Sequence, residues 1–291
     1  MTINESLPEP LNPLGLDGIE FVEYATREPL KFGAVLEMLG FVQVARHRSR
    51  EVLLYRQGGM NVIVNAEAGV AGEAAPHAAP ALMALALRVR DASYAYRHTV
   101  ELGAWPIPTR AGAMELNIPG IHAVGESIIY FVDRYQDFSI YDVDFKFLSG
   151  VDQHPPAVAG LHFFGVVQAI GAGRTAEWLD FYGHLLGFAP LPQGEYFGIL
   201  PKGTLLESPC RKFYLQLIEP PQGAEDIVWD EEWLRLGLGA TDVLAATREL
   251  RQRGVVFVDR EALHTSEKGA LTQFYLDGVA FEFVHSHLQA S

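Results

Sequence analysis

The chain has 291 residues, 49% of them apolar, and a formal net charge of −14. This composition excludes wholesale disorder, and the length predicts two domains of ordinary size. The excess of acidic side chains disfavours a nucleic-acid binder, which needs positive charge. No apolar run approaches 18 residues, so we expect no membrane span.

The N-terminal segment 1–15 and the cysteine content both favour a cytoplasmic protein. The segment is acidic and lacks the basic and apolar regions of a secretion signal. Cys210 is the single cysteine, so no internal disulfide can form. Both observations fit a reducing compartment.

The first half of the chain alternates strand patterns with helix patterns. It predicts a strand at 18–25, a helix at 29–40 and strands at 41–47, 51–57 and 60–65. The stretch 85–107 is typical of a strand, a helix that ends at a glycine, and a second strand. Aromatic and β-branched residues then predict strands within 128–145.

The second half repeats these patterns about 150 residues later. Leu-Gly-Phe ends a helical stretch at 39–41 and again at 186–188, where Leu179, Tyr182, Leu185 and Leu186 have helical spacing. The stretch 236–258 repeats 85–107, with Asp91 and either Asp242 or Thr241 as helix N-caps. The stretch 271–287 repeats 128–145.

Each half therefore contains two predicted βαβββ units. The segment 149–158 lies between the halves, and its two prolines and few apolar residues indicate a linker. We predict an N-terminal tail at 1–14, a first domain at 15–148, a linker at 149–159 and a second domain at 160–291.

Four segments, 12–25, 47–65, 114–125 and 139–145, closely resemble the first domain of bacterial 4-hydroxyphenylpyruvate dioxygenases. The resemblance continues more weakly through 160–287. It implies an α+β protein with the vicinal oxygen chelate fold of the glyoxalase/bleomycin resistance/dioxygenase superfamily, in which four βαβββ units form two tandem domains with curled mixed sheets. It also implies Fe(II), a 2-oxo acid and O2 at a 2-His-1-carboxylate site in the second domain.

The resemblance carries over only one of the three metal ligands. Glu282, in Phe281-Glu282-Phe283, matches the family's glutamate. Val166, or Gly165 if the gap shifts, occupies one histidine position, and Arg235 occupies the other. We therefore expect no bound metal and no cofactor, with Fe(II) as the cofactor if other ligands serve.

Two nearby histidines are alternative ligands. His162 lies four residues before Val166, roughly 13 Å along an extended strand at about 3.3 Å per residue. His285 lies three residues after Glu282 and should point to the opposite face of its strand. Either histidine could reach the metal position only if the register of its strand slipped. His285 and His287 together are interpreted as an exposed pair near the C-terminus.

Strand alternation predicts what the second-domain cavity contains. Trp233 and Arg235 share one strand face, and Glu282 faces inward from another strand. We predict that Arg235 and Glu282 form an ion pair in place of the metal; the other interpretation of Arg235 is a solvated strand residue. Gln273 matches a family pocket glutamine. The predicted pocket comprises Arg235, Glu282, Gln273, Trp233, Val166, Phe164 and Gln168.

Two functions from different classes remain open, and the sequence does not decide whether the protein is an enzyme. The first is a relative that has lost the Fe(II) triad and binds a small aromatic or 2-oxo acid. The second is a metal-dependent dioxygenase or another enzyme of the superfamily, including a dehydroshikimate dehydratase-type activity, with a shifted ligand set. A third, weaker option is a structural partner for another enzyme. Only nine residues follow Glu282, so we expect no closing C-terminal helix. We also expect a homo-oligomer.

Overall fold

The computed structural model describes most of the chain. The described residues are 12–67, 79–108, 115–136, 138–192, 197–198, 203–221, 223, 229–260 and 263–287.

The first half folds close to the predicted boundaries. Its elements are β1 (Ile19–Ala25), α1 (Pro29–Met38), β2 (Val42–His47), β3 (Val52–Gln57), β4 (Met60–Asn65), β5 (Ala81–Arg88), α3 (Ala92–Glu101), β6 (Gly120–His122), β7 (Ile128–Val132), α4 (Ile140–Asp144) and β8 (Phe145–Phe147).

The second half begins with a short 3-10 helix. Its elements are η1 (Val158–Gly160), β9 (His162–Ala169), α5 (Thr175–Leu186), β10 (Ala189–Pro190), β11 (Thr204–Glu207), β12 (Tyr214–Ile218), β13 (Glu232–Ala240), α6 (Val243–Gln252), β14 (Gly269–Leu271) and β15 (Phe281–His285).

The helix ends follow the local signals in the sequence. Asp91 Oδ1 accepts the backbone N–H of Tyr94, and Asp242 Oδ1 accepts that of Ala245, each at 2.8 Å. These bonds satisfy N–H groups that have no partner within the helix. Helix α5 ends at Gly187, whose φ of 78° is the left-handed conformation that glycine adopts without strain.

One prediction in the first half is incomplete. The stretch 128–145 was predicted as strands, but helix α4 lies between β7 and β8. Ser139 precedes this helix, and its backbone N–H donates to Asp142 Oδ2 at 2.8 Å. A serine followed three residues later by a carboxylate is a helix-start signal, which the aromatic content of the stretch obscured.

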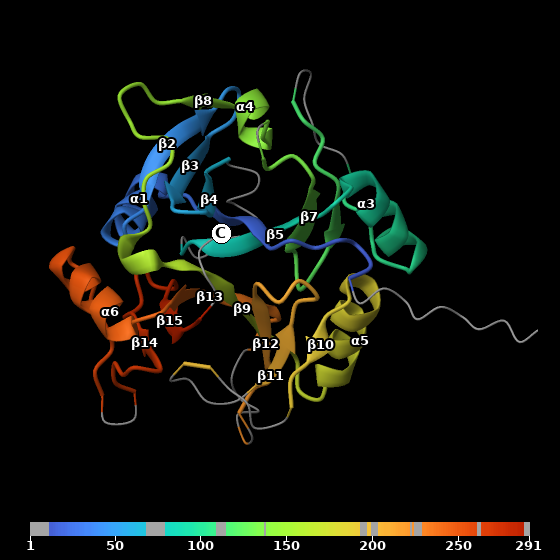
Figure 1. Cartoon of the computed structure of the whole chain (residues 1–291). Coiled ribbons are helices and arrows are strands. Elements are labelled where there is room, and N and C mark those ends of the chain that lie inside the picture. The colour runs from blue at the N-terminus through green and yellow to red at the C-terminus, as the bar shows by residue number, and fades with distance from the viewer. Residues whose placement is uncertain are drawn as a thin grey trace, which may run out of the picture.

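The strand pairing repeats between the halves. In each unit the first strand pairs in parallel with the last: β1 with β4, β5 with β7, β9 with β12 and β13 with β15. The two units of each half join through antiparallel first strands, β1 with β5 and β9 with β13. The predicted α+β class with a mixed sheet is confirmed (Figure 1).

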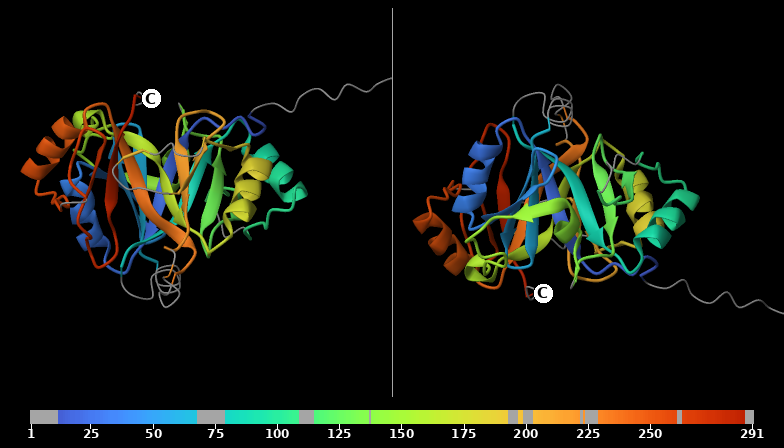
Figure 2. Two further views of the ribbon diagram at one scale, coloured as in Figure 1. Left: turned by 90° about the horizontal axis from the view of Figure 1, so that it is seen from below. Right: turned by 90° about the horizontal axis from the view of Figure 1, so that it is seen from above.

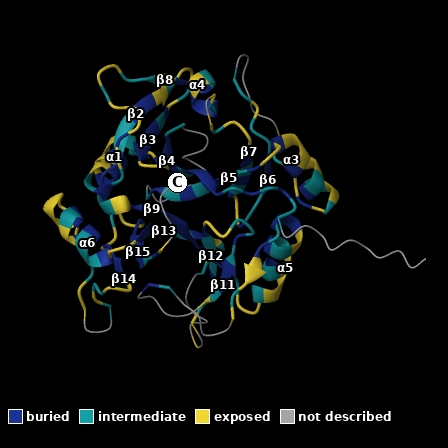
Figure 3. Cartoon of the chain, in the orientation of Figure 1, coloured by how far each residue is buried: buried dark blue, intermediate teal, exposed yellow. Residues whose placement is uncertain are grey.

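The two halves share one sheet and one core. Trp233 of β13 pairs with Leu82 of β5, which makes the sheet continuous across the halves. Helices α1 and α6 lie together at one end of the molecule, and α3 and α5 lie at the other (Figure 2). The largest buried apolar cluster contains residues of both halves, including Val22 and Leu236. Exposed residues gather on the outer faces of the helices (Figure 3).

The segment between the halves is tied to the first half. The backbone N–H of Gly58 donates to Pro155 O at 2.8 Å, and the N–H of Val158 donates to Gln57 Oε1 at 2.9 Å. The predicted linker therefore runs along the turn between β3 and β4. The domain boundaries themselves stay a prediction. None of the helices in the described part of the chain is long and apolar enough to cross a membrane.

Candidate functional site

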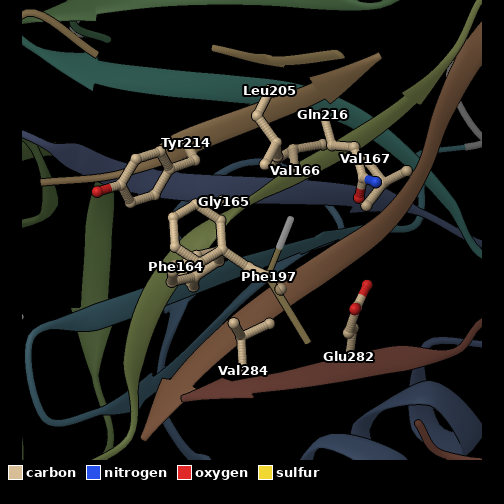
Figure 4. A pocket seen from close by; sticks show the side chains of 11 residues that line it. Phe164, Gly165, Val166, Val167, Phe197, Leu205, Tyr214, Gln216, Glu282 and Val284 are labelled. Atoms are coloured by element: carbon tan, nitrogen blue, oxygen red, sulfur yellow. The ribbon is translucent and has the colours of Figure 1, made fainter. Parts of the chain in front are cut away.

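The second half forms a pocket on the inner face of its curved strands (Figure 4). The space among its lining residues amounts to about 320 Å³ when the open solvent at its mouth is counted, and the enclosed part is much smaller. It is lined by Phe164, Gly165, Val166, Val167, Phe197, Leu205, Tyr214, Gln216, Gly237, Glu282 and Val284.

Three aromatic rings form one wall of the pocket. The ring centroids of Phe164 and Tyr214 are 5.1 Å apart, and those of Phe197 and Tyr214 are 4.8 Å apart. Phe197 also meets Phe164 edge to face. Offset-stacked and edge-on contacts of this kind are the favoured arrangements of aromatic pairs. The wall therefore suits an apolar or aromatic group.

The opposite side of the pocket contains Glu282. Arg235, which was also predicted to line the pocket, lies beside Glu282 but is not among the lining residues. Arg235 Nε is 3.5 Å from Glu282 Oε2, which is within ion-pair range but long for a hydrogen bond. The side chains of Arg235 and Glu282 are only 16% and 4% exposed. Among the described residues, no other carboxylate pairs with Arg235. The structure therefore brings together the two charged residues that the sequence paired.

Burial dominates the electrostatics of this pair. Desolvation raises the pKa of Glu282 to about 7, against a smaller lowering by Arg235. Desolvation lowers the pKa of Arg235, and the Glu282 carboxylate opposes that change. Glu282 can therefore exchange a proton near neutral pH, whereas an arginine keeps its charge.

Glycines make room for the Glu282 carboxylate. Gly237 pairs with Glu282 on one side and with Gly165 on the other, so two neighbouring strand positions present no side chain. Gly198, which belongs to a different segment, approaches the carboxylate so closely that an added Cβ would lie 2.5 Å from Glu282 Oε1. The carboxylate thus lies in a confined space.

Strand pairing turns two predicted pocket residues away from the cavity. The pairing of β13 with β9 shifts by one residue between Trp233 and Arg235, so these two side chains face opposite sides. Trp233 pairs with Gln168, and both lie on the side of helix α5, where Gln168 Oε1 accepts the Tyr182 hydroxyl. The prediction that Trp233 and Gln168 face the pocket is therefore wrong.

Neither candidate position on β9 holds a metal ligand. Val166 borders the pocket, but it pairs with Leu236 and Leu215, which belong to the helix-side core. Gly165 shares the cavity face with Gly237, yet a Cβ there would lie 2.1 Å from the backbone oxygen of Tyr214. This backbone has no room for a histidine at 165.

The alternative histidines are engaged elsewhere. The Nδ1 and Nε2 atoms of His162 lie 3.2 Å from Gly160 O and 3.0 Å from Ser286 Oγ. Burial lowers the pKa of His162, which favours a neutral ring. His285 follows Glu282 by three residues on β15 and faces the other side.

The pocket also differs from the sequence prediction at its rim. Gln273 is exposed and is not among the lining residues. Gln216 and Tyr214 do line it, and alternation along β12 could have identified them. Phe197 lies outside any strand, so no periodic signal marks it.

The donor set does not fit the Fe(II) site that the family resemblance implies. A facial triad needs two imidazoles and one carboxylate that converge on one point. Here the three positions hold Gly165 or Val166, Arg235 and Glu282. In the described residues, no three His, Cys, Asp or Glu side chains gather closely enough to hold a metal ion.

Comparison with known proteins places the chain in a family. The model of the hydroxyphenylpyruvate dioxygenase N-terminal domain matches residues 11–146. A 4-hydroxyphenylpyruvate dioxygenase of Pseudomonas sp. (strain P.J. 874) is 42% identical over 198 residues, 66% of this chain and 55% of that enzyme. The enzyme of Pseudomonas aeruginosa is 34% identical over 265 residues, 85% of this chain and 72% of that enzyme.

Two further comparisons show a wider relationship. A 3-dehydroshikimate dehydratase of Pseudomonas putida is 33% identical over 213 residues, 69% of this chain and 32% of that protein. A solved fusion protein of a xylose isomerase-like TIM barrel and a 4-hydroxyphenylpyruvate dioxygenase superposes with a TM-score of 0.76 at 24% identity. The superposition covers 100% of this chain and 52% of the fusion protein.

The repeated units, the curved mixed sheet and these matches define a protein of the vicinal oxygen chelate class. Within that class, the chain belongs to the 4-hydroxyphenylpyruvate dioxygenase family.

Proposed function

We propose that this chain is a member of its family whose second-half pocket holds no metal and binds a small aromatic or 2-oxo acid. The observation that carries the proposal is the Arg235–Glu282 pair, at 3.5 Å, at two of the three metal-ligand positions. The third position supports it, because Gly165 has no room for a side chain.

The pocket and the adjoining Arg235 together offer both parts of such a ligand a matching surface. An aromatic ring fits the wall of Phe164, Phe197 and Tyr214. A carboxylate suits the planar guanidinium of Arg235, which can donate two parallel hydrogen bonds.

The charge of the pair depends on the proton of Glu282. With both groups ionised, the pair is neutral and attracts an anion weakly. A pKa of about 7 means that Glu282 is largely protonated at mildly acidic pH, which leaves the pair with a net charge near +1. Two neutral imidazoles, one carboxylate and a divalent ion would give the same net charge. We expect acid binding to strengthen as the pH falls from 8 to 6.

Titration calorimetry with phenylpyruvate as the probe tests this function. The purified protein, treated with chelator, should bind phenylpyruvate with one site per chain. Arg235→Met should weaken binding about tenfold or more, because it removes a charge-assisted contact worth roughly 1.5–3 kcal/mol. Arg253→Met is the matched control, since Arg253 is an exposed arginine paired with Glu249 at the end of α6.

Metal analysis and an oxygen-uptake assay decide the metal question. We expect no stoichiometric iron and no consumption of 4-hydroxyphenylpyruvate after Fe(II) is added. One equivalent of Fe(II) that is lost in Glu282→Gln would overturn the metal-free proposal.

The second candidate is an enzyme of the superfamily that uses a different ligand set. The retained Glu282 and the similarity to a 3-dehydroshikimate dehydratase favour it. It requires a divalent metal at Glu282, so the same metal analysis separates the two candidates.

A further inference from the structure

A pair of histidines outside the pocket has the geometry of a metal-binding site. His285 is the last residue of β15, and His287 follows two residues later. Their Nε2 atoms are 3.3 Å apart, close enough for one ring N–H to donate to the other ring in the absence of a metal, whereas their ring centroids are 4.6 Å apart. The two rings therefore converge through their Nε2 edges.

The nitrogen separation matches the spacing of two ligands on one ion. Zinc binds histidine nitrogens at about 2.0–2.1 Å in tetrahedral geometry, which places two ligand nitrogens about 3.3 Å apart. An octahedral ion with the same bond length would need a closer approach of about 2.9 Å. The observed pair thus corresponds to the tetrahedral arrangement.

The backbone that carries the pair is held at three points. The N–H of His285 donates to Lys268 O at 3.0 Å, and the N–H of Ser286 donates to Ala240 O at 2.9 Å. On the opposite face, Ser286 Oγ lies 3.0 Å from His162 Nε2. These bonds hold the backbone at residues 285 and 286, and strand alternation places the side chains of His285 and His287 on one face.

We propose that His285 and His287 bind one zinc ion through their Nε2 atoms, at a solvent-facing site separate from the pocket. Imidazole suits zinc and the neighbouring ions copper and nickel, and it suits magnesium and calcium poorly. Water completes the coordination, because His287 is exposed and His285 is half-buried. Glu282 faces the other side of β15 and takes no part.

Zinc titration of the chelator-treated protein, followed by calorimetry, tests the site. The parent should bind one equivalent of Zn²⁺, and His285→Ala and His287→Ala should each weaken binding at least about tenfold. Loss of an outer partner of a metal ligand already costs about 10–100-fold, and these changes remove a ligand itself. His184→Ala removes an exposed histidine on α5 and should leave the affinity unchanged.

Glu282→Gln separates this site from the pocket. The variant should keep the zinc affinity of the parent. Absence of zinc binding in the parent, or equal binding by the parent and His287→Ala, would overturn the two-histidine site. Zinc that binds the histidine variants but not Glu282→Gln would overturn both this site and the metal-free pocket. His287 is exposed, so its substitution should not disturb folding.

Discussion

Arg235 and Glu282 are charged side chains held away from water in the second half. Their separation of 3.5 Å gives an ion pair without a well-formed hydrogen bond, so each depends on the other for charge compensation. This dependence has two measurable consequences.

Removing either partner should destabilise the fold. Arg235→Ala leaves a buried carboxylate, and Glu282→Ala leaves a buried guanidinium. Single losses of this kind cost about 3–5 kcal/mol. The double change Arg235→Met/Glu282→Leu keeps volume and removes both charges, so it should cost less than the two single changes combined. Urea unfolding of the four proteins measures these costs. Single variants that unfold like the parent would show that the pair contributes nothing.

The pH dependence of stability should report the protonation of Glu282. In the folded protein its pKa is about 7, compared with an ordinary value of 4.5. The folded state therefore keeps a proton that the unfolded chain releases. The stability that this retained proton contributes is complete well below pH 4.5, and it is lost as the pH rises to about 7. The loss amounts to about 3 kcal/mol at about 1.4 kcal/mol per pH unit.

Glu282→Gln isolates this contribution because it removes the titrating group. The stability difference between parent and variant should change by about 3 kcal/mol between pH 4 and pH 8, in favour of the parent at pH 4. Urea unfolding at several pH values provides the data. Parallel stability curves for the two proteins would contradict the raised pKa.

At the scale of elements, the contact between β9 and β12 determines what the pocket can hold. Gly165 pairs with Tyr214, and the strands approach so closely there that a side chain is excluded. The absence of a ligand at this position is thus a property of strand packing as well as of residue identity.

Substitution of two glycines tests this close approach. Gly165→Ala would place Cβ 2.1 Å from Tyr214 O, so the strands must separate. Such overpacking costs about 1–3 kcal/mol or more. Gly237→Ala meets its nearest neighbour, Gly165 O, at 3.4 Å and should be tolerated much better. Thermal melting of both variants compares them directly. Equal melting temperatures would show that β9 and β12 can move apart freely.

For the whole molecule, the shared sheet and shared core join the halves. The Trp233–Leu82 pairing and the common apolar cluster leave little to unfold independently. We expect one calorimetric transition, with equal calorimetric and van't Hoff enthalpies.

One core substitution in each half tests this coupling. Val22→Ala in β1 and Leu236→Ala in β13 remove fully buried side chains, and Leu→Ala changes cost about 2–5 kcal/mol. Both should lower the same single transition. Two resolved transitions, each moved by only one substitution, would show independent halves.

The sequence alone determined the repeated units, the helix starts at Asp91 and at Asp242 or Thr241, and the pairing of Arg235 with Glu282. These features depend on local periodicity, on capping chemistry and on a long resemblance, all of which a linear sequence carries. Only the tertiary structure decided where Trp233 points, because a bulge arises from the pairing of two strands and cannot be read from either one. The face that Gln168 takes on β9 likewise depends on how that strand pairs with its neighbours. The same holds for the lack of room at Gly165 and for Phe197, which reaches the pocket from outside the strands. Each depends on backbone segments that are distant in sequence and adjacent in the fold.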